Sequence, residues 1–153
     1  MAFYHSTPLR FKCTQCSQCC YGGKHAYVRA SQHEINNIID YMNIKRELFQ
    51  EKYLIKLVDH GYGIRMNTNK VGNIFGKPGH CMLLNENGKC SVYPVRPTQC
   101  RTYPFWPEIL ISKEKWNKEL ARCEGINQGD VVDSEHINQQ KELSTAAEII
   151  IND

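Results

Sequence analysis

The segment "CTQCSQCC" at residues 13–20 contains four of the eight cysteines of the chain. Two cysteines separated by two residues can aim their thiolates at one ion, and two such pairs make a tetrahedral zinc site. Three cysteines at this repeated spacing also resemble the run that holds iron–sulfur clusters, in which the fourth ligand comes from elsewhere in the chain. The segment therefore predicts a metal site near the N-terminus, around which a loop-rich domain is organised.

The adjacent pair Cys19 and Cys20 limits how this segment can bind metal. In an extended segment neighbouring side chains point to opposite sides, so both ligate one ion only with an unusual backbone. We expect one of the two to join Cys13 and Cys16, while the other reaches a second site or stays free. A closely spaced polymetallic centre would use both.

The other four cysteines are far from this segment in the sequence and complete the set of candidate metal ligands: Cys13, Cys16, Cys19, Cys20, Cys81, Cys90, Cys100 and Cys123. Eight sulfurs could hold two four-ligand sites, or one site with spare thiols. Four thiolates around zinc, or around an oxidised four-iron cluster, carry a formal charge of about −2. That charge favours cations beside the ligands. Arg96, Arg101 and Arg122 each lie within four residues of a cysteine and are the candidates.

Other roles for these residues stay open. A lone buried cysteine usually acts as a small hydrophobic side chain, which is the alternative for Cys123. Disulfides are a second alternative if the compartment is oxidising. His80, next to Cys81, and His25, just past the cysteine cluster, could be ligands, although a place on the surface or beside the metal fits them better.

Length and composition are those of an ordinary globular domain. The chain has 153 residues, 41% of them hydrophobic, and a net charge of +3. The basic residues are scattered, which argues against nucleic-acid binding. We find no secretory signal and no apolar run that could span a membrane, so the expected location is the cytoplasm, where thiols stay reduced. In such a compartment metal binding explains eight cysteines better than disulfides do.

Hydrophobic periodicity predicts two helices in the first half of the chain. Ser31 and Glu34 form a capping box before the apolar face Ile35, Ile38, Ile39 and Met42, and Asn43 can end that helix. A second helix is expected over residues 45–59. Strands are expected at residues 9–13, 24–30 and 62–68.

The second half is predicted to be more irregular. Residues 80–94 have the pattern of a hairpin, and a helical turn is expected to begin at Pro97. Residues 108–112 are predicted as a strand that pairs with residues 116–120, and a polar helix is predicted from Asp133 onward. The fold class is α+β, a small, loop-rich single domain. Residues 1–130 are expected to form the cysteine-cluster metal-binding domain, and residues 131–153 a helical tail packed on it or extending from it.

The order of the motifs resembles the bacterial CxxCxxCC (YkgJ-like) family of zinc- or iron-chelating domains. "CTQCSQCC" is followed by "CMLL", "GKCSVYPVRPTQCRTYPF" and "CEGI", and the resemblance covers about residues 11–130. It implies that all eight cysteines occupy family positions and that Arg96, Pro97, Cys100 and Arg101 form the RPxxCR element. Relatives often read C-P-G at the last motif, where this chain has Cys123-Glu124-Gly125.

The resemblance implies a metal-binding function. The family includes the metal-binding part of flagellin lysine N-methylases, in which an iron–sulfur centre and S-adenosylmethionine are implicated. We therefore expect an iron–sulfur cluster, with 4Fe–4S favoured, or zinc, held by the cysteines, with Arg96 and Arg101 beside the cofactor.

Two alternative functions follow from the same residues. One is an S-adenosylmethionine-dependent protein lysine methyltransferase that uses the cluster. The other is a zinc-stabilised module for a protein partner, with Tyr93, Tyr103, Phe105 and Trp106 as its binding surface. These aromatic residues more often form core around a metal.

Overall fold

The computed structural model describes residues 2–16, 18–20, 27–57, 61–67 and 79–152. The α-helices in these ranges are α1 (Gln32–Met42), α2 (Arg46–Tyr53), α3 (Thr98–Thr102), α4 (Lys113–Lys118) and α5 (Ser134–Asn152). The strands are β1 (Arg10–Phe11), β2 (Tyr27–Ala30), β3 (Leu54–Lys56), β4 (Tyr62–Asn67), β5 (His80–Cys81) and β6 (Ile126–Val131). Short 3-10 helices lie at Phe3–His5, Gln18–Cys20 (η2), Tyr93–Val95 and Glu119–Ala121 (η4). Helices and strands are interleaved, which confirms the α+β class.

The first predicted helix is confirmed as α1. The Ser31 side chain accepts a hydrogen bond from the Glu34 backbone N–H, and the Glu34 carboxylate accepts one from the Ser31 N–H. Asn43 ends the helix in the left-handed conformation, with a φ of 54°. Ile35, Ile38 and Ile39 are buried, so the predicted apolar face is the one that packs on the sheet.

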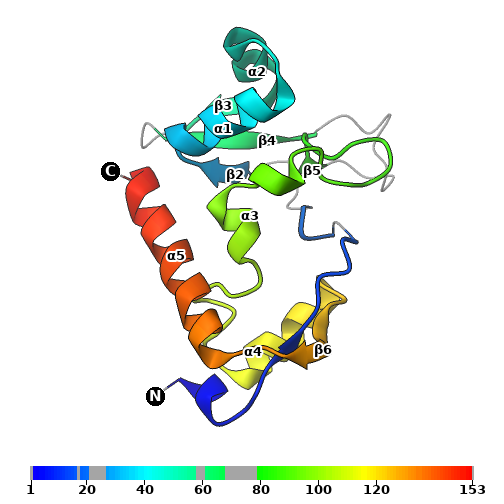
Figure 1. Ribbon diagram of the computed structural model, residues 1–153, viewed down its shortest axis with the longest axis vertical. Helices are drawn as coiled ribbons and strands as arrows, with labels where there is room; N and C mark the ends of the chain where they lie inside the picture. The colour runs from blue at the N-terminus through cyan, green and yellow to red at the C-terminus, as the bar shows by residue number, and fades with distance from the viewer. Residues whose placement is uncertain (1, 17, 21–26, 58–60, 68–78, 153) are drawn as a thin grey trace.

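A four-stranded antiparallel sheet forms one end of the molecule (Figure 1). Its strands lie in the order β2-β4-β3, and β5 pairs with β4 beyond this path. This pairing confirms the strand predicted at residues 62–68 as far as Asn67, and residue 68 lies outside the described residues. With α1 and α2 the sheet encloses the first hydrophobic core, which includes Phe49, Ile64 and Cys81.

A two-stranded sheet forms the other end of the molecule, with β1 antiparallel to β6 (Figure 1). The second hydrophobic core lies here and includes Leu9, Phe105, Trp116, Cys123 and Ile126. Trp116 is fully buried, stacks on Phe105 at 5.8 Å between ring centroids, and donates its indole N–H to Asn127 at 3.0 Å.

Helices α3 and α5 run between the two ends (Figure 1). Ile137 of α5 is buried in the second core. Tyr4 near the N-terminus donates its hydroxyl to the Asn138 side chain. The predicted C-terminal helix is therefore present and packs on the rest of the chain.

The helix predicted at residues 45–59 is wrong in its second half. Helix α2 ends at Tyr53, and the next three residues form β3, paired with β4 through Leu54 opposite Ile64. Short apolar runs are ambiguous between helix and strand, and pairing with a neighbouring strand decided this one. Residues 58–60 lie outside the described residues.

The strand pair predicted at residues 108–112 and 116–120 is also wrong. Residues 107–111 form turns in which Ile109 and Leu110 bond to the Trp106 carbonyl and are buried. Ser112 then caps α4 by accepting a hydrogen bond from Lys115, so a helix stands where the second strand was expected. Ile109 and Leu110 were predicted as part of a strand because hydrophobic periodicity alone does not distinguish a short buried strand from a buried turn or helical segment.

The predicted hairpin at residues 80–94 forms only in part. Its first arm, β5, pairs with β4, and the two arms meet at one bridge, between Leu84 and Cys90. Two predicted strands extend beyond what is described or observed: residues 24–26 lie outside the described residues, and β1 ends at Phe11 before Cys13. No helix in the described part of the chain combines the length and apolar character that a membrane crossing requires.

Candidate metal centre

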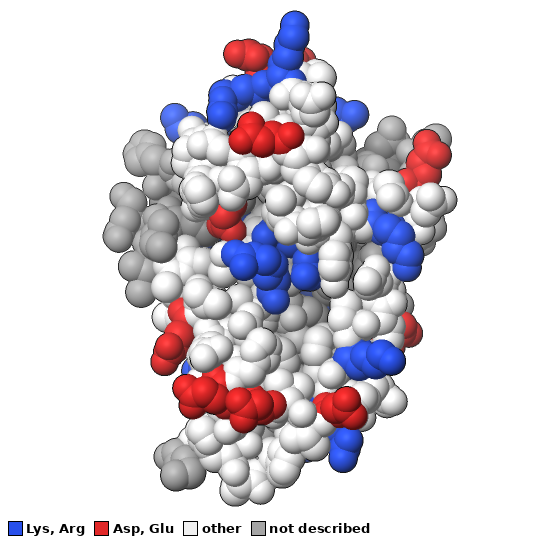
Figure 2. Space-filling model, viewed as in Figure 1, with Lys and Arg blue, Asp and Glu red and all other residues white. Residues whose placement is uncertain are grey.

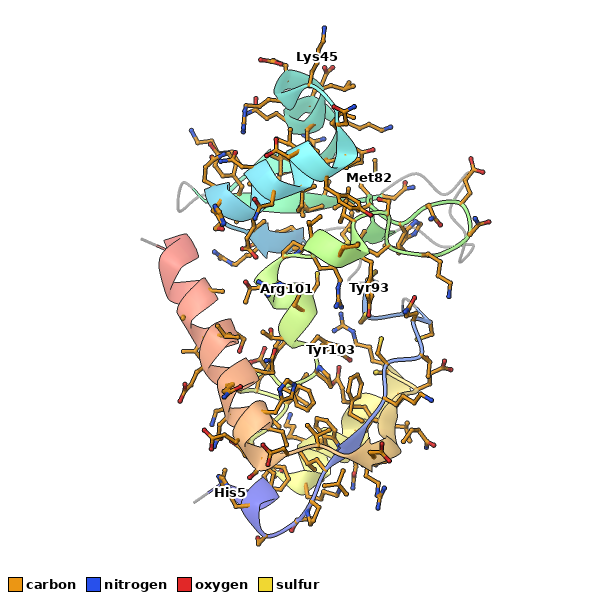
Figure 3. All side chains as sticks on the ribbon, viewed as in Figure 1. His5, Lys45, Met82, Tyr93, Arg101 and Tyr103 are labelled. Atoms are coloured by element: carbon orange, nitrogen blue, oxygen red, sulfur yellow. The ribbon has the colours of Figure 1, made fainter. Side chains whose placement is uncertain are left out.

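One cavity of about 590 Å³ lies between the two cores, and all eight cysteines line it. Its wall includes Ile64 and Leu83 from the first core and Phe105 from the second. Figure 3 places Tyr93, Arg101 and Tyr103, which also line the cavity, in the middle of the molecule between the two ends. Cysteines up to 110 residues apart in the sequence therefore face a common space.

The N-terminal cysteines reach the cavity because β1 leads directly into them. Gln15, between Cys13 and Cys16, has a φ of 56° and turns the chain in the left-handed region. Its carbonyl accepts a hydrogen bond from the Lys89 ammonium at 3.0 Å. This turn brings the CxxC pair to one side of the cavity.

The distant cysteines come from four separate elements. Cys81 lies on β5, Cys90 at the hairpin bridge, Cys100 within α3, and Cys123 just after η4. Glu34 of α1 accepts hydrogen bonds from the Thr98 N–H and hydroxyl, which ties the start of α3 to the first core. The same carboxylate that caps α1 therefore positions the helix that carries Cys100.

The eight cysteines differ in how much of their surface is exposed to solvent. Cys81 and Cys123 are buried, with 8% and 9% of their surface exposed. Cys13 and Cys19 are exposed, and the other four cysteines are intermediate. None of the eight, all of which are described, is in a disulfide.

Burial also raises the pKa of four of these thiols. It is the main cause that raises the pKa of Cys81 to about 12, and it raises the pKa of Cys90, Cys100 and Cys123. Since a cysteine must lose its proton to ligate a metal, loading this cavity would release protons.

Cys19 and Cys20 behave as a pair. The Cys20 thiol donates a hydrogen bond to the Cys19 sulfur, which lowers the pKa of Cys19 to about 7, with smaller contributions from Arg122 and Arg96. The same hydrogen bond, with burial, raises the pKa of Cys20. Cys19 is therefore the thiol of the pair that loses its proton more readily, and two guanidinium groups favour its thiolate.

The three arginines singled out in the sequence all line the cavity but have different contacts. Arg122 donates to the Cys19 carbonyl at 3.2 Å, and its guanidinium lies 5.7 Å from the Tyr103 ring centroid. Arg96 stacks on the Tyr93 ring at 3.9 Å and lowers the pKa of Cys19. Arg101 donates to the Arg96 carbonyl and to the Thr98 hydroxyl. Figure 2 shows basic side chains gathered beside the hollow at the centre of this face.

The aromatic residues near the cysteines divide between wall and core. Phe105 is buried in the second core, and Tyr103 packs edge-on against Trp106 at 5.0 Å. Tyr103 donates its hydroxyl to Glu119. Tyr93 is at the edge of the cavity with 36% of its surface exposed.

Sequence reasoning missed several residues of the cavity wall, among them Lys89, His136 and Gln140. Lys89 directly precedes a cysteine, which is a signal that could have identified it. His136 and Gln140 lie on α5 and carry no motif. His80 is buried, with its pKa lowered by that burial, whereas His25 lies outside the described residues.

The eight sulfurs line the wall but do not surround one point. Among the residues that the structure describes, no three Cys, His, Asp or Glu side chains are grouped so that they could hold a single metal ion. The donor set itself fits a metal group, because eight thiols, apolar walls and two nearby guanidiniums face one space. The cavity is therefore a cysteine-rich candidate metal site.

The family of the chain agrees with this site. The model of the CxxCxxCC family, described as a "putative zinc- or iron-chelating domain", matches residues 12–124, and the chain belongs to this family. Zinc or iron binding is the function that membership supports. No solved structure matches the chain.

Proposed function

We propose that the chain holds iron–sulfur centres, with 4Fe–4S favoured over zinc, and that the eight cysteines are the ligands. The observation that supports this most directly is that all eight line one cavity, although they come from five separate segments of the chain. The repeated two-residue spacing of Cys13, Cys16 and Cys19 is typical of cluster-binding runs.

The volume of the cavity favours a polynuclear centre. Four thiolates around one zinc ion lie about 2.3 Å from the metal, which places the sulfurs close together. The cavity here measures about 590 Å³, whereas a water molecule occupies roughly 30 Å³ in the liquid. A centre with several iron atoms would reach sulfurs on separate walls of such a space.

The charges beside the cysteines support the same assignment. Four-thiolate centres are negative, and guanidiniums beside them stabilise that charge. Arg96 and Arg122 are close enough to lower the pKa of Cys19, so they are the residues best placed for this role. Arg101 steadies the Arg96 backbone and would act beside the centre through it.

The test is purification without oxygen, followed by iron, zinc and acid-labile sulfide analysis and a visible spectrum on one sample. Iron with sulfide and a broad brown absorbance is the expected result. A colourless protein that carries zinc would overturn the cluster assignment and favour a zinc-stabilised interaction module. A protein without any metal would contradict both.

An S-adenosylmethionine-dependent lysine methyltransferase is the second candidate. The cavity extends past the cysteines to Tyr103, His136 and Gln140, so there is polar wall beside the sulfurs for an organic ligand. Titration calorimetry of S-adenosylmethionine into the anaerobic protein tests this candidate. Binding that Gln140→Leu weakens would support it, whereas no heat of binding would remove it.

A further inference from the structure

The cysteines around the cavity fall into two groups that belong to different halves of the fold. Cys81 is part of the first core, and Cys20, Cys90 and Cys100 pack against that core. Cys123 is part of the second core. We propose that the chain carries two four-cysteine metal sites. The first, of Cys20, Cys81, Cys90 and Cys100, has no solvent-exposed member and is named the buried site. The second, of Cys13, Cys16, Cys19 and Cys123, is named the exposed site because Cys13 and Cys19 are exposed, although Cys123 is buried. This proposal rests on the proposed function and adds how its ligands are divided.

Strand pairing accounts for the exposed group. In the antiparallel β1–β6 pair, Phe11 lies opposite Ile126, so residues after Phe11 run beside residues before Ile126. The Lys12 N–H donates to the Gly125 carbonyl at 3.1 Å, and the Thr14 hydroxyl donates to the Glu124 carboxylate. Cys13 and Cys16 are thereby held beside Cys123, 110 and 107 residues further along the chain.

The buried group is assembled by the four-stranded sheet and the elements docked on it. Cys81 lies opposite Met66 of β4. The neighbouring bridge and the Ser91 N–H, which donates to the Leu83 carbonyl at 2.9 Å, hold Cys90 close to it. Next to Cys100, the Gln99 side chain accepts a hydrogen bond from the Arg29 N–H of β2 at 2.8 Å. These contacts use none of the backbone that holds the exposed group.

The assignment of the adjacent pair follows from what each residue contacts. Cys20 packs on the first core, together with Cys90 and Cys100. Cys19 is exposed, and its carbonyl accepts a hydrogen bond from Arg122, the neighbour of Cys123, at 3.2 Å.

The neighbours of Cys123, unlike those of Cys20, belong to the second core and to the N-terminal cysteine segment. Cys123 itself belongs to the second core, and the hydrogen bonds from Lys12 to Gly125 and from Thr14 to Glu124 hold the segment that carries Cys13 beside it. The adjacent cysteines thus divide between the sites, one for each half of the fold.

The two sites would exchange metal at different rates. The exposed group includes two solvent-exposed cysteines, whereas the buried group includes none. A chelator reaches exposed thiolates first, so the exposed site is the exchangeable one and the buried site retains its metal.

The first test uses the anaerobically purified wild-type protein, with a chelator and an alkylating reagent present together. After the fast phase of metal release, peptide mass spectrometry should find Cys13, Cys16, Cys19 and Cys123 alkylated and the other four protected. Alkylation spread evenly over both groups, or release in a single phase, would overturn the division. Wild-type protein without metal would instead overturn the proposed function.

Single substitutions provide the second test. Cys16→Ser should lose the fast phase and keep about half of the metal, whereas Cys100→Ser should lose the slow phase. Gln15→Asn is the matched control, because asparagine tolerates the left-handed backbone at this position and no thiol is removed. Folded Cys16→Ser protein that has lost all of its metal would show one shared centre and contradict two sites.

Discussion

The two ends of the molecule bring cysteines to one cavity in different ways. At the sheet of β2, β3, β4 and β5, the cysteines are attached to a core of buried aliphatic residues and are themselves largely shielded. At the β1–β6 end, the ligand segment is a loop held by backbone hydrogen bonds, and two of its cysteines are exposed. We infer from this difference that the two proposed sites are supported differently, one by a core and the other by a loop at the edge of the cavity.

The largest expected effect comes from removing a buried ligand. Cys100→Ser should lower the free energy of unfolding by about 3 kcal/mol or more, because metal binding energy at a structural site is also folding energy. Cys16→Ser should cost about 1 kcal/mol, since its group lies at the exposed edge. Urea unfolding of the two variants, purified without oxygen, measures both decreases. Equal decreases in the free energy of unfolding would contradict a difference in stability between the two sites.

Truncating one buried aromatic residue in each core tests whether the two cores support separate metal sites. The two truncations should lower the free energy of unfolding by similar amounts. Trp116→Ala and Phe49→Ala each remove a fully buried aromatic ring and should cost about 3–5 kcal/mol. Trp116 belongs to the second core and Phe49 to the first. The first substitution should speed metal release from the exposed group and the second from the buried group. If both change the same phase, as measured by chelator kinetics, the cores do not support separate sites.

One glycine at each end of the molecule allows a test of how the backbone there supports its metal site. A Cβ at Gly125 would lie 2.0 Å from the Lys12 carbonyl oxygen, and one at Gly63 would lie 2.9 Å from the Tyr27 Cβ. Gly125→Ala should therefore separate β1 from the Cys123 segment, at a cost of about 1–3 kcal/mol, and release the exposed metal. Gly63→Ala should disturb the β2–β4 pair and leave the exposed metal in place. Metal analysis before and after brief chelation distinguishes these outcomes.

The smallest expected effect concerns charge. Arg122→Gln should speed metal release from the exposed group about tenfold, because loss of a residue that supports ligands typically costs 10–100-fold in affinity. Arg46→Gln is the control, since it removes the same charge from an exposed position on α2 that does not line the cavity. Equal rates for Arg122→Gln and the wild type would show that Arg122 does not stabilise the site.

Local signals made α1 predictable from the sequence. Its capping box, apolar face and terminal Asn43 are all encoded within thirteen residues, and the structure has each of them. The α+β class was also predictable, because it depends only on the mixture of periodic segments. In contrast, β3 and the turns at residues 107–111 depend on neighbours far along the chain, which short apolar runs do not reveal.

The cysteine set could be recognised from spacing, but its arrangement could not. Spacing alone predicted that Cys19 and Cys20 would not share one ion easily. The β1–β6 pairing, which sets Cys123 beside Cys13, was missed because β6 reads Ile-Asn-Gln-Gly-Asp-Val and has no apolar alternation. The polar wall contributed by His136 and Gln140 was missed because both lie on a helix without a motif.

The most direct measurement is anomalous X-ray scattering from crystals of the anaerobically purified protein, collected at the iron and zinc edges. We predict two separate iron peaks in the cavity, one nearest Cys81 and Cys100 and the other nearest Cys16 and Cys123. A single peak shared by both groups, or no metal among the cysteines, would contradict two cysteine-held sites.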